Sequence, residues 1–372
     1  MNAPAAPTTR QVVFPAKDRI VVDDAPLPAP GADDVLVRIR RVGICATDLH
    51  LLAGHIGDPF PLVPGHEFVG EVAALGDEAA RARGLRPGDR IAVEMLLPCR
   101  SCARCREGRY NLCEQDDPGA GLARGRQLGV NIPRSHGHGL WGGYAEHVLV
   151  PAEAIVHRLP DDLPWERAVL VEPLAVAHRA LARGRVASGD RVVVIGPGPV
   201  GLLAAAAARS AGAARVVVVG TRASRLDPAR RFGADAVVNT RASSDLVADV
   251  RTALGGDLAD VVIEIAGVTG AQRDALRLVR RGGRVVLAGA CGAGAELTLL
   301  ADEELLTREV DVLPSFLSAG GFEPAIAQLA RGEFPYEQLV THTVGLAEVE
   351  GAFALIASRD DTVIKIAIDP AR

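Results

Sequence analysis

The spacing of hydrophobic residues divides the chain into two parts with different patterns. Between Val12 and about Val93, short runs of β-branched and apolar residues alternate with turns that contain proline and glycine. The runs cover residues 35–42, 68–74 and 90–93. Runs of this length bounded by turn residues are typical of β-strands. The first part of the chain is therefore expected to be a β-rich domain.

After Pro164 the pattern changes to strands that alternate with helices. Strands are expected where consecutive residues are apolar, at 191–195, 216–219, 261–265 and 284–288, and an alanine-rich helix is expected at 200–211. Strands that are apolar at every position are typical of a parallel sheet covered by helices on both faces. The fold class is therefore α/β, with a doubly wound domain over residues 166–310.

The remaining segment, residues 311–372, is too short to be assigned to a third domain. It contains two expected helices, 322–330 and 347–358, and a final strand at 362–368. We expect the segment to return to the first domain, which then comprises residues 1–165 and 311–372. The chain length of 372 residues agrees with two domains.

Composition and charge narrow the class of partner. The chain is 48% hydrophobic and 23% charged, with a formal net charge of -5 and no long run of one sign. Nucleic acids and anionic membranes attract basic patches, so neither is an expected partner, and small molecules are. The first ten residues lack the basic start and apolar stretch of a secretory signal, and no apolar stretch is suited to a bilayer span. A cytoplasmic location is expected.

Four of the six cysteines are crowded into one segment, residues 98–114. They are Cys99, Cys102, Cys105 and Cys113. In a long chain without an export signal, this spacing indicates metal binding rather than disulfides. Zinc accepts four thiolates in a tetrahedral site that leaves no coordination position open. The segment is therefore predicted to bind a structural zinc ion.

A glycine-rich turn follows the expected strand at 191–195 and opens the expected helix. Its residues are Gly196, Pro197, Gly198, Pro199, Val200 and Gly201. Between a strand and a helix, this spacing of glycines is typical of a dinucleotide site, where the helix N-terminus faces the pyrophosphate. The turn is predicted to bind a nicotinamide cofactor.

The segment after the next strand indicates which nicotinamide cofactor is bound. NAD-binding domains place an acidic residue there to accept hydrogen bonds from the ribose 2′-hydroxyl. This chain has Thr221, Arg222 and Arg225 instead. Hydroxyl and guanidinium groups suit a 2′-phosphate, so NADP(H) is predicted. The alternative is that these arginines are ordinary solvated surface residues and the cofactor is NAD.

Further candidate ligands are dispersed along the chain. Cys45, Thr47, Asp48 and His50 occur in one segment, His66 and Glu67 in a second, and Glu172 in a third. Each of these residues alone is a weak signal. Their occurrence in this order, together with the four-cysteine segment and the glycine-rich turn, is the stronger observation.

With these motifs the chain resembles the zinc-dependent medium-chain dehydrogenase/reductase superfamily, which includes the alcohol and polyol dehydrogenases. The resemblance covers almost the entire chain and is greatest to the sorbitol, glucose and threonine dehydrogenase branch, because Glu172 stands where alcohol dehydrogenases place a second cysteine. It implies a GroES-like catalytic domain formed by both chain ends and an inserted Rossmann domain, with the active site in the cleft. It also implies a homodimer or homotetramer.

The resemblance further implies roles for the dispersed residues. Cys45 and His66 hold a catalytic zinc ion, and Asp48 orients His66. Whether Glu67 or Glu172 is the additional ligand stays open. Thr47 accepts the hydroxyl proton of an alcohol and passes it, through the cofactor ribose, to His50. Lys365, in the closing strand, either reaches a cofactor phosphate or ends that strand.

These inferences predict an NADP(H)-dependent zinc alcohol dehydrogenase, with two zinc ions per chain, that acts on a secondary alcohol, polyol or sugar-like substrate or on the corresponding ketone. One alternative is an NAD-dependent polyol or amino-alcohol dehydrogenase of the same family. Another is a zinc-free quinone or enoyl reductase, although such enzymes generally lack the cysteine segment and the Cys/His pair. A zinc-binding structural or regulatory protein without catalysis is the alternative from a different class.

Overall fold

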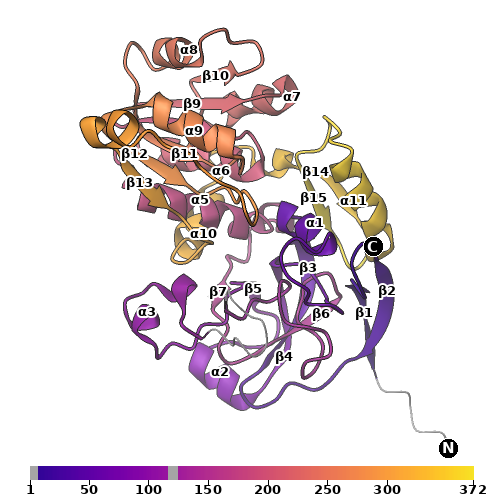
Figure 1. Ribbon diagram of the computed structural model, residues 1–372. Coiled ribbons are helices and arrows are strands. Elements are labelled where there is room, and N and C mark those ends of the chain that lie inside the picture. Colours follow the sequence, from indigo (N-terminus) through magenta and orange to yellow (C-terminus); the bar gives the residue numbers. More distant parts are fainter. Residues whose placement is uncertain (1–6, 116–124) are drawn as a thin grey trace, which may run out of the picture. The chain divides into compact units, whose positions relative to one another are not determined.

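The computed structural model describes residues 7–115 and 125–372 and divides the chain into two compact units (Figure 1). Unit 1 comprises the chain up to Glu172 together with Val340–Arg372. Unit 2 comprises Pro173–Leu339. Both ends of the chain thus belong to one unit. Among the described residues, no helix is long and apolar enough to cross a membrane.

A seven-stranded sheet is the framework of unit 1. Its strand order is β14-β15-β3-β4-β5-β7, and β6 also pairs with β3. The strands are β3 (Val35–Gly43), β4 (Glu67–Leu75), β5 (Arg90–Val93), β6 (His147–Val150), β7 (Val156–Arg158), β14 (Val340–Val344) and β15 (Lys365–Ile368). Strand β15 pairs in parallel with β14 and antiparallel with β3. The last strand of the chain therefore lies inside this sheet, not at its edge.

Aromatic packing joins the chain ends within unit 1. The ring of Phe353 makes edge-to-face contacts with Phe14, at 5.8 Å between centroids, and with Tyr144, at 6.4 Å. Such pairs add to the hydrophobic stabilisation of a core. The remaining elements of unit 1 are β1 (Thr8–Val13), β2 (Val21–Pro26), α1 (Ala46–Leu52), α2 (Asp77–Arg83), α3 (Ala103–Arg106), α4 (Trp165–Ala168) and α11 (Val349–Ala357).

Unit 2 is a doubly wound α/β structure. Its six strands, all parallel, are ordered β10-β9-β8-β11-β12-β13. They are β8 (Arg191–Ile195), β9 (Arg215–Gly220), β10 (Ala236–Asn239), β11 (Ala259–Glu264), β12 (Val279–Leu287) and β13 (Asp311–Pro314). The order reverses between β8 and β11, and ligands of such sheets bind at this switch point, beyond the carboxyl ends of the strands. The predicted α/β fold class is confirmed.

Valines and helices account for the core of unit 2. Val192, Val193 and Val194 of β8 are each completely buried, because helices cover both faces of the sheet. The helices are α6 (Pro199–Ser210), α7 (Ala223–Leu226), α8 (Leu246–Ala253), α9 (Thr269–Leu278) and α10 (Phe322–Arg331), and α5 (Val171–Arg183) begins at the junction of the two units.

Unit 2 extends further along the chain than the sequence indicated. The doubly wound domain was expected to end at residue 310, whereas β13 adds a sixth parallel strand beside β12 and unit 2 continues to Leu339. Only four residues form β13, and its ends, Asp311 and Pro314, are exposed. So short a strand lacks the apolar run that revealed the others. From Val340 onward the chain does belong with the N-terminal part.

Candidate functional site

Three potential metal ligands from two segments converge in unit 1. A sulfur of Cys45, a ring nitrogen of His66 and a carboxylate oxygen of Glu67 all lie within 4.8 Å of one another. His66 and Glu67 are each 2% exposed, and Cys45 is partly buried. Thiolate, imidazole and carboxylate are the ligands that zinc accepts in proteins. This set of donors therefore fits a zinc ion.

The backbone around these ligands is fixed by local contacts. Cys45 immediately precedes α1, and its N–H donates to Oδ2 of Asp48 at 2.8 Å, which caps the helix. Gly65, before His66, has a φ of +99°, and a Cβ there would lie 2.3 Å from the ring of Tyr144. Only glycine can adopt this φ in so little space, so Gly65 fixes the path of the chain through His66 to the start of β4 at Glu67.

Asp48 and Tyr144 form a buried hydrogen-bonded group beneath His66. Oδ1 of Asp48 lies 3.4 Å from Nδ1 of His66, and Oδ2 accepts a hydrogen bond from the hydroxyl of Tyr144 at 2.7 Å. Burial acts to lower the pKa of His66, but the charge and hydrogen bond of Asp48, with a contribution from Cys45, raise this pKa well above its usual value. Because Nδ1 faces Asp48, Nε2 is the nitrogen that suits a metal.

Tyr144 was not among the residues singled out from the sequence. Its side chain is completely buried, and both burial and the neighbouring Asp48 raise the pKa of its hydroxyl well above the usual value. The phenol therefore stays protonated and acts as a hydrogen-bond donor to Asp48. The sequence offered no signal for this role, because a tyrosine after two glycines is compatible with any turn.

Lys365 and Glu172 complete the charged surroundings of the three ligands. The ammonium of Lys365 forms an ion pair with Oε2 of Glu67, and the two side chains are 3% and 1% exposed. From the sequence, Lys365 was expected to reach a cofactor phosphate or to end its strand; its partner in the structure is Glu67. Glu172 is 7% exposed and lies outside the group of three ligands. Burial and the charge of Glu67 raise the pKa of Glu172 to about 7.

Thr47 and His50 lie on helix α1, three residues apart and hence on the same face. The Oγ1 atom of Thr47 is 3.6 Å from the sulfur of Cys45. His50 is in the last turn, is exposed, and has its Nδ1 atom 3.3 Å from Nδ1 of His55. The helix therefore leads from the potential ligands to an exposed pair of imidazoles.

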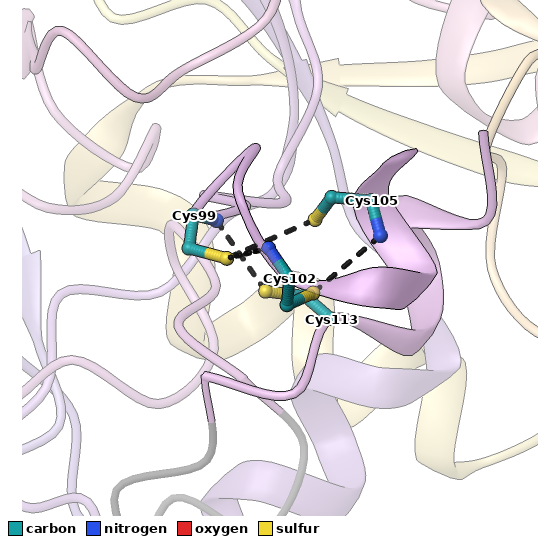
Figure 2. A group of neighbouring side chains, drawn as sticks. All are labelled: Cys99, Cys102, Cys105 and Cys113. Carbon is teal, nitrogen blue, oxygen red and sulfur yellow. Dashed lines mark hydrogen bonds between the residues drawn. The ribbon is translucent and has the colours of Figure 1, made fainter. Parts of the chain in front are cut away.

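The four clustered cysteines point their sulfurs toward one another, as Figure 2 shows. The sulfurs of Cys99 and Cys105 are 4.0 Å apart, and all six cysteines of the chain are free. Four sulfurs at about 2.3 Å from a tetrahedral zinc ion would be separated by about 3.8 Å. The arrangement is therefore close to the one that the sequence predicted for a structural zinc ion.

Backbone N–H groups point at these sulfurs. The N–H of Cys102 donates to the sulfur of Cys99 at 3.3 Å, and the N–H groups of Cys105 and Glu114 donate to the sulfur of Cys102 at 3.4 Å. Hydrogen bonds from Ser101 lower the pKa of Cys99 to about 6, whereas burial raises that of Cys105 to about 12. N–H groups that donate to sulfur stabilise thiolates, which are the form that binds metal.

In unit 2 the glycine-rich turn has the shape expected of a nucleotide-binding turn. Gly196 follows β8 with a φ of +109°, and a Cβ there would lie 2.7 Å from the nitrogen of Ala266. Gly201 allows close packing, because its Cβ would lie 1.8 Å from the oxygen of Gly196. Gly198 precedes α6, and a Cβ there would meet nothing within 4 Å. The backbone is therefore open at the helix N-terminus, where a phosphate would bind.

The segment with Arg222 adjoins this turn. Strand β9 pairs with β8, and Gly220 at its end packs against the turn, since a Cβ there would lie 2.5 Å from the ring of Pro197. Thr221 follows and is exposed, while Arg222 and Arg225 are partly exposed on either side of the start of α7. The hydroxyl of Thr221 and the guanidinium groups of Arg222 and Arg225 thus follow the carboxyl end of β9, at the same ends of the strands as the glycine-rich turn.

A buried carboxylate that no sequence motif indicated lies at the same ends of the strands. Glu264, the last residue of β11, is completely buried and is aligned with Ile195 of β8. One of its oxygens accepts a hydrogen bond from the N–H of Gly267 at 2.8 Å. Burial raises the pKa of Glu264 to about 7 despite this hydrogen bond. Its position at the end of a continuous apolar run was the available signal.

This pKa predicts a pH-dependent cost to stability. Below about pH 4.5 Glu264 is protonated in both the folded and the unfolded chain, whereas above about pH 7 the folded chain must bury its charge, at a cost of up to about 3 kcal/mol. Glu264→Gln should therefore raise the melting temperature relative to the wild type, increasingly from pH 5 to 8. The exposed Glu296→Gln variant is the control. A difference in melting temperature between Glu264→Gln and the wild type that stayed constant from pH 5 to 8 would contradict the raised pKa of Glu264.

The chain is similar to known dehydrogenases over almost its full length. Residues 31–161 match the family described as alcohol dehydrogenase GroES-like domain, and residues 199–331 match the zinc-binding dehydrogenase family. A probable alcohol dehydrogenase of Mycobacterium tuberculosis is 38% identical over 95% of this chain and 96% of its own length. Sorbitol dehydrogenase of Bombyx mori is 34% identical over 91% of this chain and 92% of its own length. A protein of Sinorhizobium meliloti whose structure was solved with NADP bound is 30% identical, with a TM-score of 0.86 over 98% of this chain and 100% of its own.

Proposed function

Because the chain belongs to the zinc-dependent medium-chain alcohol dehydrogenase family, we propose that it transfers hydride between NADP(H) and a secondary alcohol, polyol or sugar-like substrate, or the corresponding ketone. The observation that carries this proposal is the convergence of Cys45, His66 and Glu67 within 4.8 Å. A protein that only needed zinc for its structure would require the four cysteines and not this second, mostly buried group. We also propose that the chain forms a homodimer or homotetramer.

The residues of unit 1 supply distinct parts of the mechanism. Cys45, His66 and a carboxylate would hold a zinc ion, which would supply Lewis-acid chemistry that lowers the pKa of an alcohol hydroxyl. Asp48 keeps the ring of His66 oriented through Nδ1. Thr47 would accept the hydroxyl proton of the alcohol and His50 would deliver it to solvent, and a bound nicotinamide cofactor would supply the hydride acceptor. Reduction of a ketone uses the same groups in reverse.

Residues at two positions of unit 2 support the choice of cofactor. The glycine-rich turn at residues 196–201 leaves the N-terminus of α6 open for a pyrophosphate. The 2′-phosphate of NADP would then bind near Thr221, Arg222 and Arg225. The relative from Sinorhizobium meliloti, which binds NADP, agrees with this choice. If the arginines do not contact the cofactor, the chain is instead an NAD-dependent polyol or amino-alcohol dehydrogenase.

Arg222→Ala is expected to raise the KM for NADP about tenfold to a hundredfold and to leave the KM for NAD nearly unchanged. The reason is that a hydrogen bond to a charged phosphate contributes about 1.5–3 kcal/mol, and NAD lacks that phosphate. Initial rates with each cofactor measure the effect. Arg251→Ala, at an exposed position of α8, is the matched control. Equal changes for both cofactors, or comparable kcat/KM values for NAD and NADP in the wild type, would overturn the NADP preference.

Metal analysis together with a substrate screen tests the activity itself. The two candidate metal groups predict two zinc ions per chain. Secondary alcohols and polyols should reduce NADP, and ketones should oxidise NADPH, as followed by NADPH absorbance. One zinc ion per chain and no turnover of any alcohol or ketone would instead favour a zinc-binding structural or regulatory protein.

A further inference from the structure

Two histidines meet at the C-terminal end of α1 in unit 1. His50 is in the last turn of the helix, and His55 follows the helix in the chain. Both residues are exposed, and their Nδ1 atoms lie 3.3 Å apart. The proposed proton transfer uses His50 alone and gives no role to His55.

The backbone at the end of α1 fixes this pair. Gly54 has a φ of +69°, and its N–H donates to the carbonyl oxygen of Leu51 at 2.9 Å. The N–H of His55 donates to the carbonyl oxygen of His50, also at 2.9 Å. Two such hydrogen bonds around a left-handed glycine form a Schellman motif, in which the side chains at the positions of His50 and His55 come into contact. The two imidazoles are therefore held together before any ligand binds.

The distance between the two nitrogens fits a shared metal ion. Two nitrogens at about 2.0–2.1 Å from a tetrahedral zinc ion would be separated by about 3.3 Å. The Nδ1 atoms of His50 and His55 have this separation. A hydrogen bond from an N–H group usually spans about 2.7–3.2 Å, so the rings are slightly farther apart than a hydrogen bond between them would place them. The pair thus has the geometry of a two-nitrogen chelate.

The number and type of ligands indicate which ions would bind. Among the residues that the structure describes, no third cysteine, histidine, aspartate or glutamate joins this pair within 4.8 Å. Water would fill the other coordination positions, so a metal ion would bind reversibly and more weakly than one held by three or four side chains. Imidazole suits Zn²⁺, Ni²⁺ and Cu²⁺, whereas Mg²⁺ and Ca²⁺ prefer oxygen ligands.

We propose that His50 and His55 form a site for a divalent transition-metal ion such as Zn²⁺, and that occupancy of this site inhibits the enzyme. An imidazole that binds metal through Nδ1 carries its proton on Nε2 and has no nitrogen left to accept another. His50 in this state cannot take up the proton that leaves Thr47. The inhibition rests on the proposed function, because it requires His50 to carry the substrate proton, whereas binding of the metal ion does not.

Zinc binding measured without turnover tests the site itself. The full chain is first loaded with zinc at its tighter sites, then equilibrated with micromolar Zn²⁺, and the additional bound metal is measured. The wild type should bind one more ion than His55→Gln. The variant should hold that ion about a hundredfold more weakly, because a second ligand on the same framework raises affinity by about this factor or more. His136→Gln removes an exposed histidine from another loop and should bind zinc like the wild type.

Inhibition by added zinc tests the consequence for activity. Without added metal, His55→Gln should turn over an alcohol at the wild-type rate, because His55 has no part in the proposed mechanism. The Zn²⁺ concentration that halves the rate should be about a hundredfold higher for His55→Gln than for the wild type. His136→Gln should be inhibited at the wild-type concentration.

The site and its inhibitory role can fail separately. Equal binding of the additional zinc ion by the wild type and His55→Gln would overturn the site. An ion that binds through the histidine pair without slowing the wild type would overturn the inhibitory role. A chain that turns over no alcohol or ketone would overturn the proposed function and the inhibition with it, while the difference in zinc binding between the wild type and His55→Gln would still decide whether the site exists.

Discussion

Replacing Cys45 with serine is expected to lower kcat/KM with NADP and an alcohol by about a thousandfold or more. Lewis-acid stabilisation by a bound metal contributes several kcal/mol to a transition state, and each 1.4 kcal/mol or so corresponds to about a tenfold change in rate. Serine is a poor zinc ligand, and His66 and Glu67 would be left as a pair. The zinc content should fall from about two ions to about one ion per chain.

The fold should survive this change, because Cys45 is only partly buried and its backbone N–H still bonds to Asp48. Cys291→Ser is the matched control, since Cys291 is a partly buried free cysteine outside both candidate metal groups. Steady-state kinetics, zinc analysis and melting temperature measured on the same samples distinguish the outcomes. If Cys45→Ser retained its activity within tenfold of the wild type, the assignment of a catalytic zinc ion to this group would be wrong.

Replacing Cys102 with serine is expected to have the largest effect on stability. The sulfur of Cys102 is one of four candidate ligands and accepts two backbone hydrogen bonds, so its loss removes both the metal and the order around it. Structural zinc contributes folding energy directly. A loss of several kcal/mol corresponds to a decrease of about 10 °C or more in melting temperature, with the zinc content again lower by one ion.

The two cysteine variants should therefore lose different properties: Cys45→Ser should lose activity and keep its stability, and Cys102→Ser should lose stability first. Cys102→Ser should be prone to proteolysis near residues 98–114, while its remaining folded molecules keep their activity at low temperature. Tyr110 joins this segment to the sheet through hydrogen bonds of 3.0 and 2.9 Å to the buried Glu94, so the effect should extend into β5. A Cys102→Ser protein that melted like the wild type and kept two zinc ions would contradict the structural site.

Features set by neighbouring residues could be predicted from the sequence. Strand β8 occupies residues 191–195 as expected, because an uninterrupted apolar run can only be buried on both faces. The four cysteines lie within one short segment, so their spacing alone brought them within reach of one ion. The glycine-rich turn was found in the same way, since its positions lie between one strand and one helix.

Features that depend on distant residues could not be predicted in this way. The ion pair of Glu67 with Lys365 depends on β15 lying beside β3, which no local pattern specifies. Tyr144 was missed for the same reason, because its role follows from its contact with Asp48. Strand β13 was missed because hydrogen bonding to β12, and not an apolar run, makes it a strand. Sequence patterns reveal local burial, whereas these features arise from tertiary pairing.

The position of β15 within the sheet of unit 1 also bears on how the protein is made. The ribosome makes Lys365–Ile368 after all the other strands of this sheet, yet this strand lies between β14 and β3. The intervening Pro173–Leu339 leaves the ribosome first and can complete its own parallel sheet during synthesis. Until Lys365–Ile368 has been synthesised, Val42 and Gly43 of β3 lack β15 as a partner and Glu67 lacks its buried counter-ion. The buried surroundings of Glu67 are therefore complete only after β15 has been made and has paired with β3.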